Sequence, residues 1–365
     1  MNVWALIDGI SLLTVAALTG FLIPQILLIA FKKQLFDEPD ERKVHTLPVP
    51  RLGGIAFLPV ILFTMLLMAG IGMQYGSLWI REIPADSIRE SVFIAAGALS
   101  LFIVGMADDL IGVRYRAKFV VQGGAAVLLV ISGLILNNFH GLFGLHYINM
   151  IVAVLLTILL IVFITNAINL IDGIDGLASG LSAIACLVYG IILYDSEIYL
   201  FSQIAFCLMA ALTTFFIFNV FGDPKKHKKI FMGDTGALTV GFLLSALALR
   251  LCNEPDTCGH YNYAVVAFAP LLVPCMDVVR VYMHRIRNRT NPFLPDKNHI
   301  HHKLLAAGMN QRLAMITIVS FSALLSVLNI WLSLYLNLTI LLVLDVAIWI
   351  ILNIWLSKRI ISRNK

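Results

Sequence analysis

Apolar runs long enough to cross a lipid bilayer recur along the whole chain, separated by short polar segments. A helix needs about 20 apolar residues to cross the hydrocarbon core of a membrane. The pattern therefore predicts about eleven membrane-spanning helices and an all-α fold, a polytopic integral membrane helical bundle. The predicted spans lie near residues 3–31, 52–73, 90–107, 119–137, 148–166, 177–194, 199–221, 237–251, 262–283, 313–333 and 338–357.

The composition excludes a soluble domain of any size. Of the 365 residues, 60% are hydrophobic and 13% are charged, whereas soluble domains carry about 25% charged residues. We therefore expect residues 1–365 to form a single transmembrane domain. The first apolar run has neither a basic flank nor a small-residue cleavage site, which predicts a retained helix rather than a removable signal peptide.

The basic residues are divided unevenly between the two sides of the predicted membrane. When the connecting segments are assigned alternately, one side holds all of the 26 lysines and arginines except Arg81, Arg89 and Arg250. Because basic loops remain in the cytoplasm, this asymmetry predicts an N-terminus outside and a C-terminus in the cytoplasm. The net charge of +5 then reflects orientation and attraction to anionic lipid headgroups, and it requires no nucleic-acid partner.

Each cytoplasmic connection also carries a compact cluster of polar residues, whereas the outer connections are chemically plain. These clusters lie in segments 32–54, 108–118, 165–180, 222–237 and 284–305. Taken alone, the first of them is best interpreted as a basic membrane anchor. The other four contain residues that this interpretation does not explain.

The segment "TNAINLIDGIDGLASG" places two amides and two acids between long apolar runs. Asn166 and Asn169 are three residues apart, as are Asp172 and Asp175, so each pair shares one face if the segment is helical. The glycine after each aspartate equally allows a tight turn. Irregular backbone at this depth is tolerated only where it lines protein or a water-filled cavity, which favours a functional site.

Three further aspartates lie at the predicted ends of spans. Asp108 and Asp109 end the third span, where an acid opposes the helix dipole. Neighbouring residues of a helix point about 100° apart, so one carboxylate can face a central site while the other faces elsewhere. Asp234, in "MGDTG", begins the eighth span and is either a helix cap or part of a site.

The last cytoplasmic segment is rich in arginine and histidine. Arg285 and Arg287 precede two prolines, and His299, His301 and His302 follow in "HIHH". A zinc site is one interpretation. A phosphate-binding site is the better one, because guanidinium binds phosphate bidentately and imidazole donates a hydrogen bond.

Together these clusters indicate phosphoryl chemistry. The hard oxygen ligands come from three segments: Asp108, Asp109, Asn169, Asp172, Asp175 and Asp234. Oxygen ligands that leave room for substrate phosphates favour Mg²⁺ or Mn²⁺. A divalent cation beside Arg and His is typical of phosphoryl transfer, and a site at headgroup level indicates a lipid partner. The residues alone thus predict a metal-dependent phosphotransferase that acts on a lipid phosphate.

The ordered motifs "RKVHTLPVPRLGG", "ADDLIGVRYRAK", "NAINLIDGIDGLASG", "FMGDTGAL" and "NPFLPDKNHIHH" resemble those of the bacterial polyprenyl-phosphate N-acetylhexosamine-1-phosphate transferases. They are more distantly similar to those of phospho-N-acetylmuramoyl-pentapeptide transferase. The resemblance implies that undecaprenyl phosphate attacks the sugar-proximal phosphorus of UDP-GlcNAc, giving undecaprenyl-diphospho-GlcNAc and UMP. It implies a multi-pass enzyme of the bacterial inner membrane, with its active site in the cytoplasm, that begins the synthesis of a cell-envelope glycan.

The resemblance also implies roles for individual residues. Asn169 and Asp234 are the expected ligands of Mg²⁺, with Mn²⁺ as an alternative. The expected catalytic residues are Asp108 and Asp109 beside the lipid phosphate, Asp172 and Asp175 around the nucleotide sugar, and Arg285, His299, His301 and His302 around the diphosphate. The expected substrate-binding residues are His45, Arg51, Lys118, Asn166 and Arg287. A homodimer is left open.

Three alternatives remain at this point. A cation-coupled transporter would explain Asp345 deep in the last span, although a hydrogen bond to a neighbouring helix explains it more simply. A lipid phosphatase would use the same site with water as nucleophile. Within the transferase, direct attack is favoured because a phosphate monoester has its second pKa near 6 and is mostly dianionic at neutral pH. A route through an aspartyl-phosphate is also open.

Overall fold

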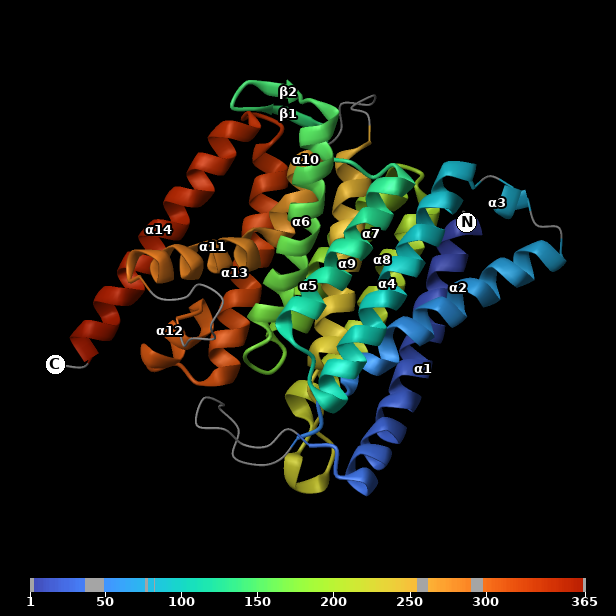
Figure 1. The fold of residues 1–365 in the computed structure, drawn as a ribbon, viewed down its shortest axis with the longest axis horizontal. Coiled ribbons are helices and arrows are strands. Elements are labelled where there is room, and N and C mark those ends of the chain that lie inside the picture. The colour runs from blue at the N-terminus through green and yellow to red at the C-terminus, as the bar shows by residue number, and fades with distance from the viewer. Residues whose placement is uncertain are drawn as a thin grey trace.

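The computed structural model describes residues 3–36, 49–75, 78–81, 83–254, 262–289 and 298–363. Eleven helical segments in these ranges are long and apolar enough to cross a membrane, which confirms the predicted helical bundle. The helices, shown in Figure 1, are α1 (Val3–Lys33), α2 (Phe57–Gln74), α3 (Leu78–Arg81), α4 (Ala85–Ile111), α5 (Tyr115–Ser132), α6 (Met150–Ile171), α7 (Leu177–Asp195), α8 (Tyr199–Phe221), α9 (Gly233–Cys252), α10 (Tyr263–Phe268), α11 (Leu272–Arg287), α12 (Ile300–Ala306), α13 (Gln311–Leu332) and α14 (Leu338–Arg363). Three short 3₁₀ turns are η1 (Gly53–Ala56), η2 (Pro224–Lys226) and η3 (Ala269–Leu271).

Helix α9 is the centre of the bundle and is buried along almost its whole length. It packs against α4, α6, α7 and α10. Small residues permit these close approaches: a Cβ added to Gly241 would lie 2.7 Å from the Cα of Thr165 on α6, and one added to Gly105 of α4 would lie 2.6 Å from the Cα of Thr235. Close backbone contact through small residues is typical of helix packing in membranes.

The outer surface of the bundle is apolar, as a membrane requires. Helices such as α1, α2 and α14 expose many large aliphatic and aromatic side chains, including Phe21, Leu66 and Ile351. A soluble protein rarely exposes apolar patches larger than a few hundred Å². The chain is therefore a multi-pass membrane protein.

Two parts of the fold differ from a simple set of straight helices. Strands β1 (Asn138–Leu142) and β2 (Leu145–Tyr147) form an antiparallel hairpin where the sequence analysis expected only a loop. Its two turn residues, Phe143 and Gly144, both have positive φ, as in the type I′ turns that suit hairpins. The ninth span is divided into α10, η3 and α11 at Pro270, because proline cannot donate the helical hydrogen bond. Pro274 lies in the first turn of α11, where its missing N–H is tolerated.

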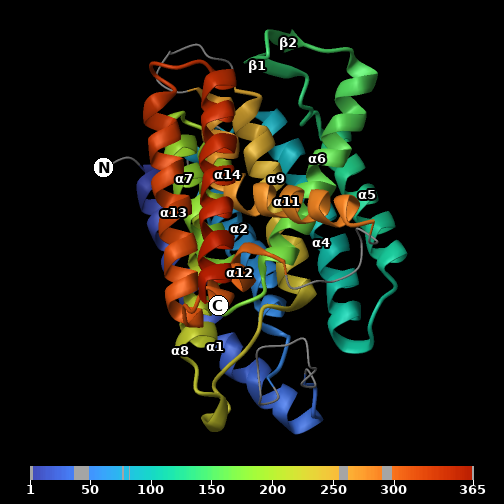
Figure 2. The ribbon, with the colours of Figure 1, turned by 90° about the vertical axis from the view of Figure 1, so that its left-hand side faces the viewer.

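The views in Figures 1 and 2 show that α11 lies across the other long helices instead of running alongside them. The β hairpin is at one end of the bundle, and the α4–α5, α6–α7 and α8–α9 connections are at the opposite end with α12 and the C-terminus (Figure 1). The predicted clusters in these three connections, within segments 108–118, 165–180 and 222–237, thus lie at one end of the fold. Which side of the membrane that end faces stays a prediction.

Candidate active site

The segments "PRLGG" and "FMGDTG", far apart in the sequence, form a short paired stretch at this end of the bundle. The backbone N–H of Phe231 donates to the carbonyl of Pro50 at 2.8 Å. The N–H groups of Gly53 and Gly54 donate to the carbonyls of Phe231 and Met232 at 2.9 and 2.8 Å. This pairing fixes the start of α9 against the start of α2.

Glycine is required at this junction because backbones meet there without room for side chains. A Cβ added to Gly54 would lie 2.1 Å from the backbone nitrogen of Gly236. Gly233 has φ of +74°, and a Cβ there would lie 2.2 Å from the carbonyl oxygen of Arg51 and 2.5 Å from a carboxylate oxygen of Asp109. Close backbone packing therefore requires glycine at these positions of the two motifs.

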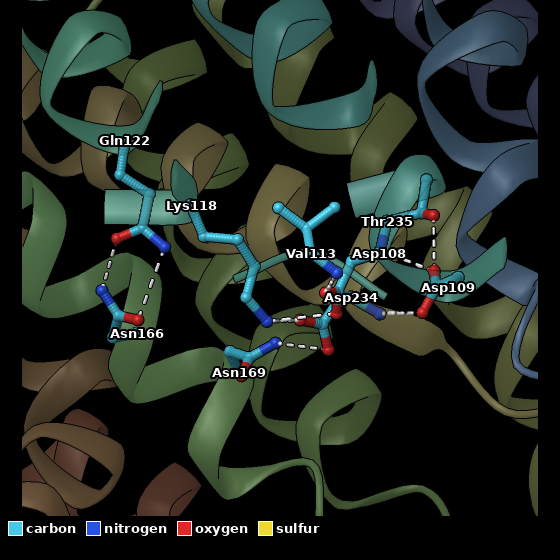
Figure 3. Close-up of polar contacts among 9 residues, drawn as sticks. All are labelled: Asp108, Asp109, Val113, Lys118, Gln122, Asn166, Asn169, Asp234 and Thr235. Atoms are coloured by element: carbon cyan, nitrogen blue, oxygen red, sulfur yellow. Dashed lines mark hydrogen bonds and ion pairs between the residues drawn. The ribbon is translucent and has the colours of Figure 1, made fainter. Parts of the chain in front are cut away.

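Asp109 holds the N-terminus of α9. Its carboxylate accepts hydrogen bonds from the N–H of Asp234 at 2.8 Å, the N–H of Thr235 at 2.9 Å and the hydroxyl of Thr235 at 2.5 Å (Figure 3). The first N–H groups of a helix lack internal partners, and a negative charge is favourable there. Asp109 therefore caps α9 from a neighbouring helix and positions Asp234. Its expected place beside the lipid phosphate stays a prediction.

Asp108 points the other way, as the 100° rule predicts, into a cluster of charged groups. Its Oδ2 accepts from Nζ of Lys118 at 3.1 Å, and the same Nζ donates to Oδ2 of Asp234 at 2.7 Å. Asn169 donates from Nδ2 to Oδ1 of Asp234 at 3.2 Å. Figure 3 shows these four side chains converging from α4, α5, α6 and α9. We call Asp108, Lys118, Asn169 and Asp234 the acidic cluster.

The acidic cluster has the donor chemistry that Mg²⁺ prefers. No group of three or more His, Cys, Asp or Glu side chains within the described part of the chain is arranged to hold a metal by itself. Mg²⁺, however, is commonly bound by one or two carboxylates together with substrate phosphates. Asp234 and Asp108 fit that pattern. Asn169 would join them by turning its amide so that the oxygen faces inward, and Lys118 now supplies the positive charge between the two acids.

The turn between α6 and α7 carries the two acids of the segment "TNAINLIDGIDGLASG". Because α6 ends at Ile171 and α7 begins at Leu177, Asp172 and Asp175 lie in a turn and not on one helical face. Asp175 forms a salt bridge of 2.5 Å with Lys229. Burial raises the pKa of Asp172 to about 7, against the opposing charge of Arg51.

The raised pKa of Asp172 gives a testable pH dependence. A carboxyl group whose pKa is higher in the folded than in the unfolded protein destabilises the fold as the pH rises from about 4 to about 7, because the folded state retains the proton. We expect the melting temperature of the wild type, relative to that of Asp172→Asn, to fall across this window. Thermal unfolding in detergent at several pH values measures the difference, and parallel curves would contradict it.

Asn219, which the sequence analysis did not single out, holds this turn in place. Its Oδ1 accepts from the N–H of Gly176 at 2.6 Å, and its Nδ2 donates to the carbonyl of Ile230 at 2.8 Å. The side chain thus joins the α6–α7 turn to the segment before α9. A buried amide near the end of an apolar span was the signal that would have identified it.

Residues 298–302, which we call the histidine segment, include His299, His301 and His302. His301 of this segment packs against the α6–α7 turn. His301 is 1% exposed, and a Cβ added to Gly173 would lie 2.2 Å from its Nε2. Its ring is stacked on that of His299, with centroids 5.8 Å apart, and contacts that of His302. Burial, followed by the neighbouring His302 and His299, lowers the pKa of His301 to about 3. His301 is therefore neutral at physiological pH and can offer one N–H and one lone pair to a ligand.

His299 depends on an acid that the sequence analysis passed over. Asp277 of α11 is fully buried, and its Oδ2 lies 2.8 Å from Nδ1 of His299. An acid in the ninth span, three residues before Arg280, was the signal that would have revealed it. Arg285, on the same helix, is 8% exposed, whereas Arg287 is exposed at the helix end.

Three further acidic, amide and histidine residues that the sequence indicated have different outcomes in the structure. Asn166 exchanges amide hydrogen bonds with Gln122 of α5 at 2.6 and 3.4 Å (Figure 3). This pair joins α6 to α5, and the expected role of Asn166 in substrate binding stays a prediction. His45 lies outside the described residues. Asp345 accepts a hydrogen bond of 2.9 Å from Asn329 of α13, which confirms the simpler explanation of that acid and removes the main support for a transporter.

Comparisons with known proteins show the family to which the chain belongs. The profile of Glycosyl transferase family 4 matches residues 91–252. A Bacillus subtilis protein, named a probable undecaprenyl-phosphate N-acetylglucosaminyl 1-phosphate transferase, is 32% identical over 335 residues, covering 89% of this chain and 86% of its own. The chain belongs to the polyprenyl-phosphate N-acetylhexosamine-1-phosphate transferase family.

Two other members of this transferase family show the same extent of similarity. The undecaprenyl-phosphate alpha-N-acetylglucosaminyl 1-phosphate transferase of Salmonella typhi is 30% identical over 300 residues, which is 82% of this chain and 76% of its own. The enzyme of the same name from Escherichia coli K12 is 29% identical over 304 residues, which is 83% of this chain and 77% of its own. The range matched by the family profile, residues 91–252, includes all four residues of the acidic cluster.

Proposed function

We propose that this transferase moves GlcNAc-1-phosphate from UDP-GlcNAc to undecaprenyl phosphate, giving undecaprenyl-diphospho-GlcNAc and UMP. The observation that carries the proposal is the convergence of Asp108, Lys118, Asn169 and Asp234, with His301 packed against the turn that follows α6. The names of the relatives supply the acceptor and the sugar. We infer from the basic residues of these connections that the site faces the cytoplasm, in the inner membrane of a bacterium.

In the proposed reaction an oxygen of the lipid phosphate attacks the sugar-proximal phosphorus of UDP-GlcNAc. The bond from that phosphorus to the bridging oxygen breaks, and UMP leaves with the oxygen and its electron pair. Mg²⁺, held by Asp234 and Asn169 with Asp108 nearby, would neutralise the charge that builds on the diphosphate, and Mn²⁺ is the expected substitute. Positioning and charge stabilisation would supply most of the catalysis.

The residues of the site have separable roles in this scheme. Lys118 forms ion pairs with Asp108 and Asp234, and in the bound state its ammonium group would also pair with a phosphate oxygen of the substrate. His301 is neutral, so it would orient oxygens by a single hydrogen bond and contribute no full charge. A general base is not required, since the lipid phosphate is mostly dianionic at neutral pH. Asp109 favours this view, because its carboxylate is already engaged in capping α9.

The proposal predicts a specific requirement for both substrates. Purified protein in detergent should release UMP from UDP-GlcNAc only when undecaprenyl phosphate and Mg²⁺ are both present. Chromatography of the nucleotide products measures this release, and a panel of UDP-sugars in the same assay tests the choice of sugar. Release of inorganic phosphate from the lipid without any nucleotide sugar would instead indicate a phosphatase, and no turnover at all would remove the enzyme assignment.

A further inference from the structure

A fully buried carboxylate on α11 organises the residues around His299. Oδ1 of Asp277 accepts from the N–H of Ile300 at 3.0 Å and from Nη2 of Arg280 at 2.8 Å. Its Oδ2 takes the Nδ1 hydrogen of His299 at 2.8 Å. Asp277 is 0% exposed and His299 is 5% exposed, so these bonds are shielded from water.

Asp277 and Arg280 together hold three consecutive residues of the histidine segment by hydrogen bonds. Arg280 donates from Nη2 to the carbonyl oxygen of Asn298 as well as to Asp277. Asn298 is thereby held through Arg280, His299 through its ring and Ile300 through its backbone N–H. The beginning of α12, and with it the orientation of the His299 ring, is set from α11.

This arrangement selects one ring nitrogen for the site. A neutral imidazole donates from one nitrogen and accepts at the other, and the partner of one nitrogen fixes the role of the other. Because a carboxylate can only accept, Nδ1 of His299 must carry a proton. Nε2 is left as the ring atom for a ligand, beside the His301 ring that packs against the α6–α7 turn.

We propose that Asp277, supported by Arg280, is a positioning residue that presents Nε2 of His299 to the diphosphate of the nucleotide sugar. The proposal rests on the proposed function for the identity of that ligand. Asp277 itself does not touch substrate and acts only through His299. The competing explanation is a purely structural one, in which Asp277 caps α12 through Ile300 and the ring contact is incidental.

Asp277→Asn separates these explanations. An asparagine can keep its oxygen toward Ile300 and Arg280, but its NH₂ group then faces Nδ1 of His299. Two donors cannot bond to each other, so the His299 proton should move from Nδ1 to Nε2. We expect kcat/KM for UMP release to fall about 100-fold, the magnitude typical of losing one aligned donor or acceptor, with a melting temperature close to that of the wild type.

The tautomer of His299 gives the readout that a structural role would not change. In ¹⁵N-histidine-labelled protein, His299→Asn identifies the His299 resonance by its absence. We expect a protonated Nδ1 in the wild type and a protonated Nε2 in Asp277→Asn. Asp345→Asn is the matched control, because it alters a buried carboxylate with an amide partner on other helices, and it should change neither the tautomer nor the turnover.

The outcomes are distinct. Unchanged His299 tautomer in Asp277→Asn, with or without a loss of turnover, would overturn the proposal in favour of simple capping. If Asp277→Asn does not fold, the wild-type spectrum decides, since a His299 protonated only on Nε2 would overturn the proposal without any variant at Asp277. Absence of turnover in the wild type would refute the proposed function, while the tautomer measurement would still judge the role of Asp277.

Discussion

Asp234→Asn is expected to reduce the rate of UMP release about 1,000-fold and to weaken the dependence on Mg²⁺. The substitution keeps the shape of the side chain but removes one negative charge from the acidic cluster, where Asp234 contacts both Lys118 and Asn169. A carboxylate attracts a divalent cation far more strongly than an amide does, and removing one preorganised charge contact typically costs 100- to 1,000-fold in rate. Initial rates of UMP release across a Mg²⁺ titration measure both effects.

The protein should remain folded, because the cap on α9 does not use the Asp234 side chain. Asp109 accepts from the backbone N–H of Asp234, which the substitution leaves intact. Asp86→Asn is the matched control: it lies at the other end of α4 and pairs with the exposed Arg89 at 2.8 Å. Such surface ion pairs contribute roughly 0–1 kcal/mol. Wild-type rates and Mg²⁺ response in Asp234→Asn would remove this residue from the metal site.

The helices and the clustering of polar segments could be predicted from the sequence because one force dominates both. Eleven apolar runs must be buried in lipid, and their lengths are set by the thickness of the membrane. Polar residues are then confined to the ends of the helices. The opposed directions of Asp108 and Asp109 followed in the same way, from the 3.6-residue period of a helix.

What the sequence did not show depends on tertiary contacts. Asp277 and Asn219 each act on a segment that is distant along the chain, His299 in one case and Gly176 in the other. No periodicity reports such a contact. From the sequence, the segment between α6 and α7 could be either helix or turn. In the structure it is a turn, and Gly176 within it has φ of +76°.

The glycines of the polar segments have neighbours that the sequence alone could not name. The sequence indicated only that the glycines after Asp172 and Asp175 allow a tight turn. In the structure, Gly54 contacts the backbone of Gly236, and Gly173 contacts the ring of His301. The close neighbours are thus other parts of the same protein. These glycines position the site by letting its segments meet, which is a role that only coordinates reveal.

Gly54→Ala is therefore expected to be as damaging as the loss of a charged residue. The added methyl group would lie 2.1 Å from the backbone nitrogen of Gly236 and 2.2 Å from its Cα, and backbone atoms cannot move away as a flexible side chain can. Overpacking costs roughly 1–3 kcal/mol in ordinary cores. Here it also pushes η1 away from the start of α9, where Asp109 and Asp234 are held.

We expect Gly54→Ala to lower the melting temperature and to reduce UMP release at least 100-fold, a loss typical when a catalytic geometry moves by about 1 Å. Gly70→Ala is the matched control in α2, the helix that follows η1, because a Cβ at Gly70 meets nothing within 4 Å. Alanine in a helix is favoured over glycine by about 0.5–1 kcal/mol, so this control should be neutral or stabilising. Equal melting temperatures and equal rates of UMP release in the two variants would show that the contact between Gly54 and Gly236 does not position the site.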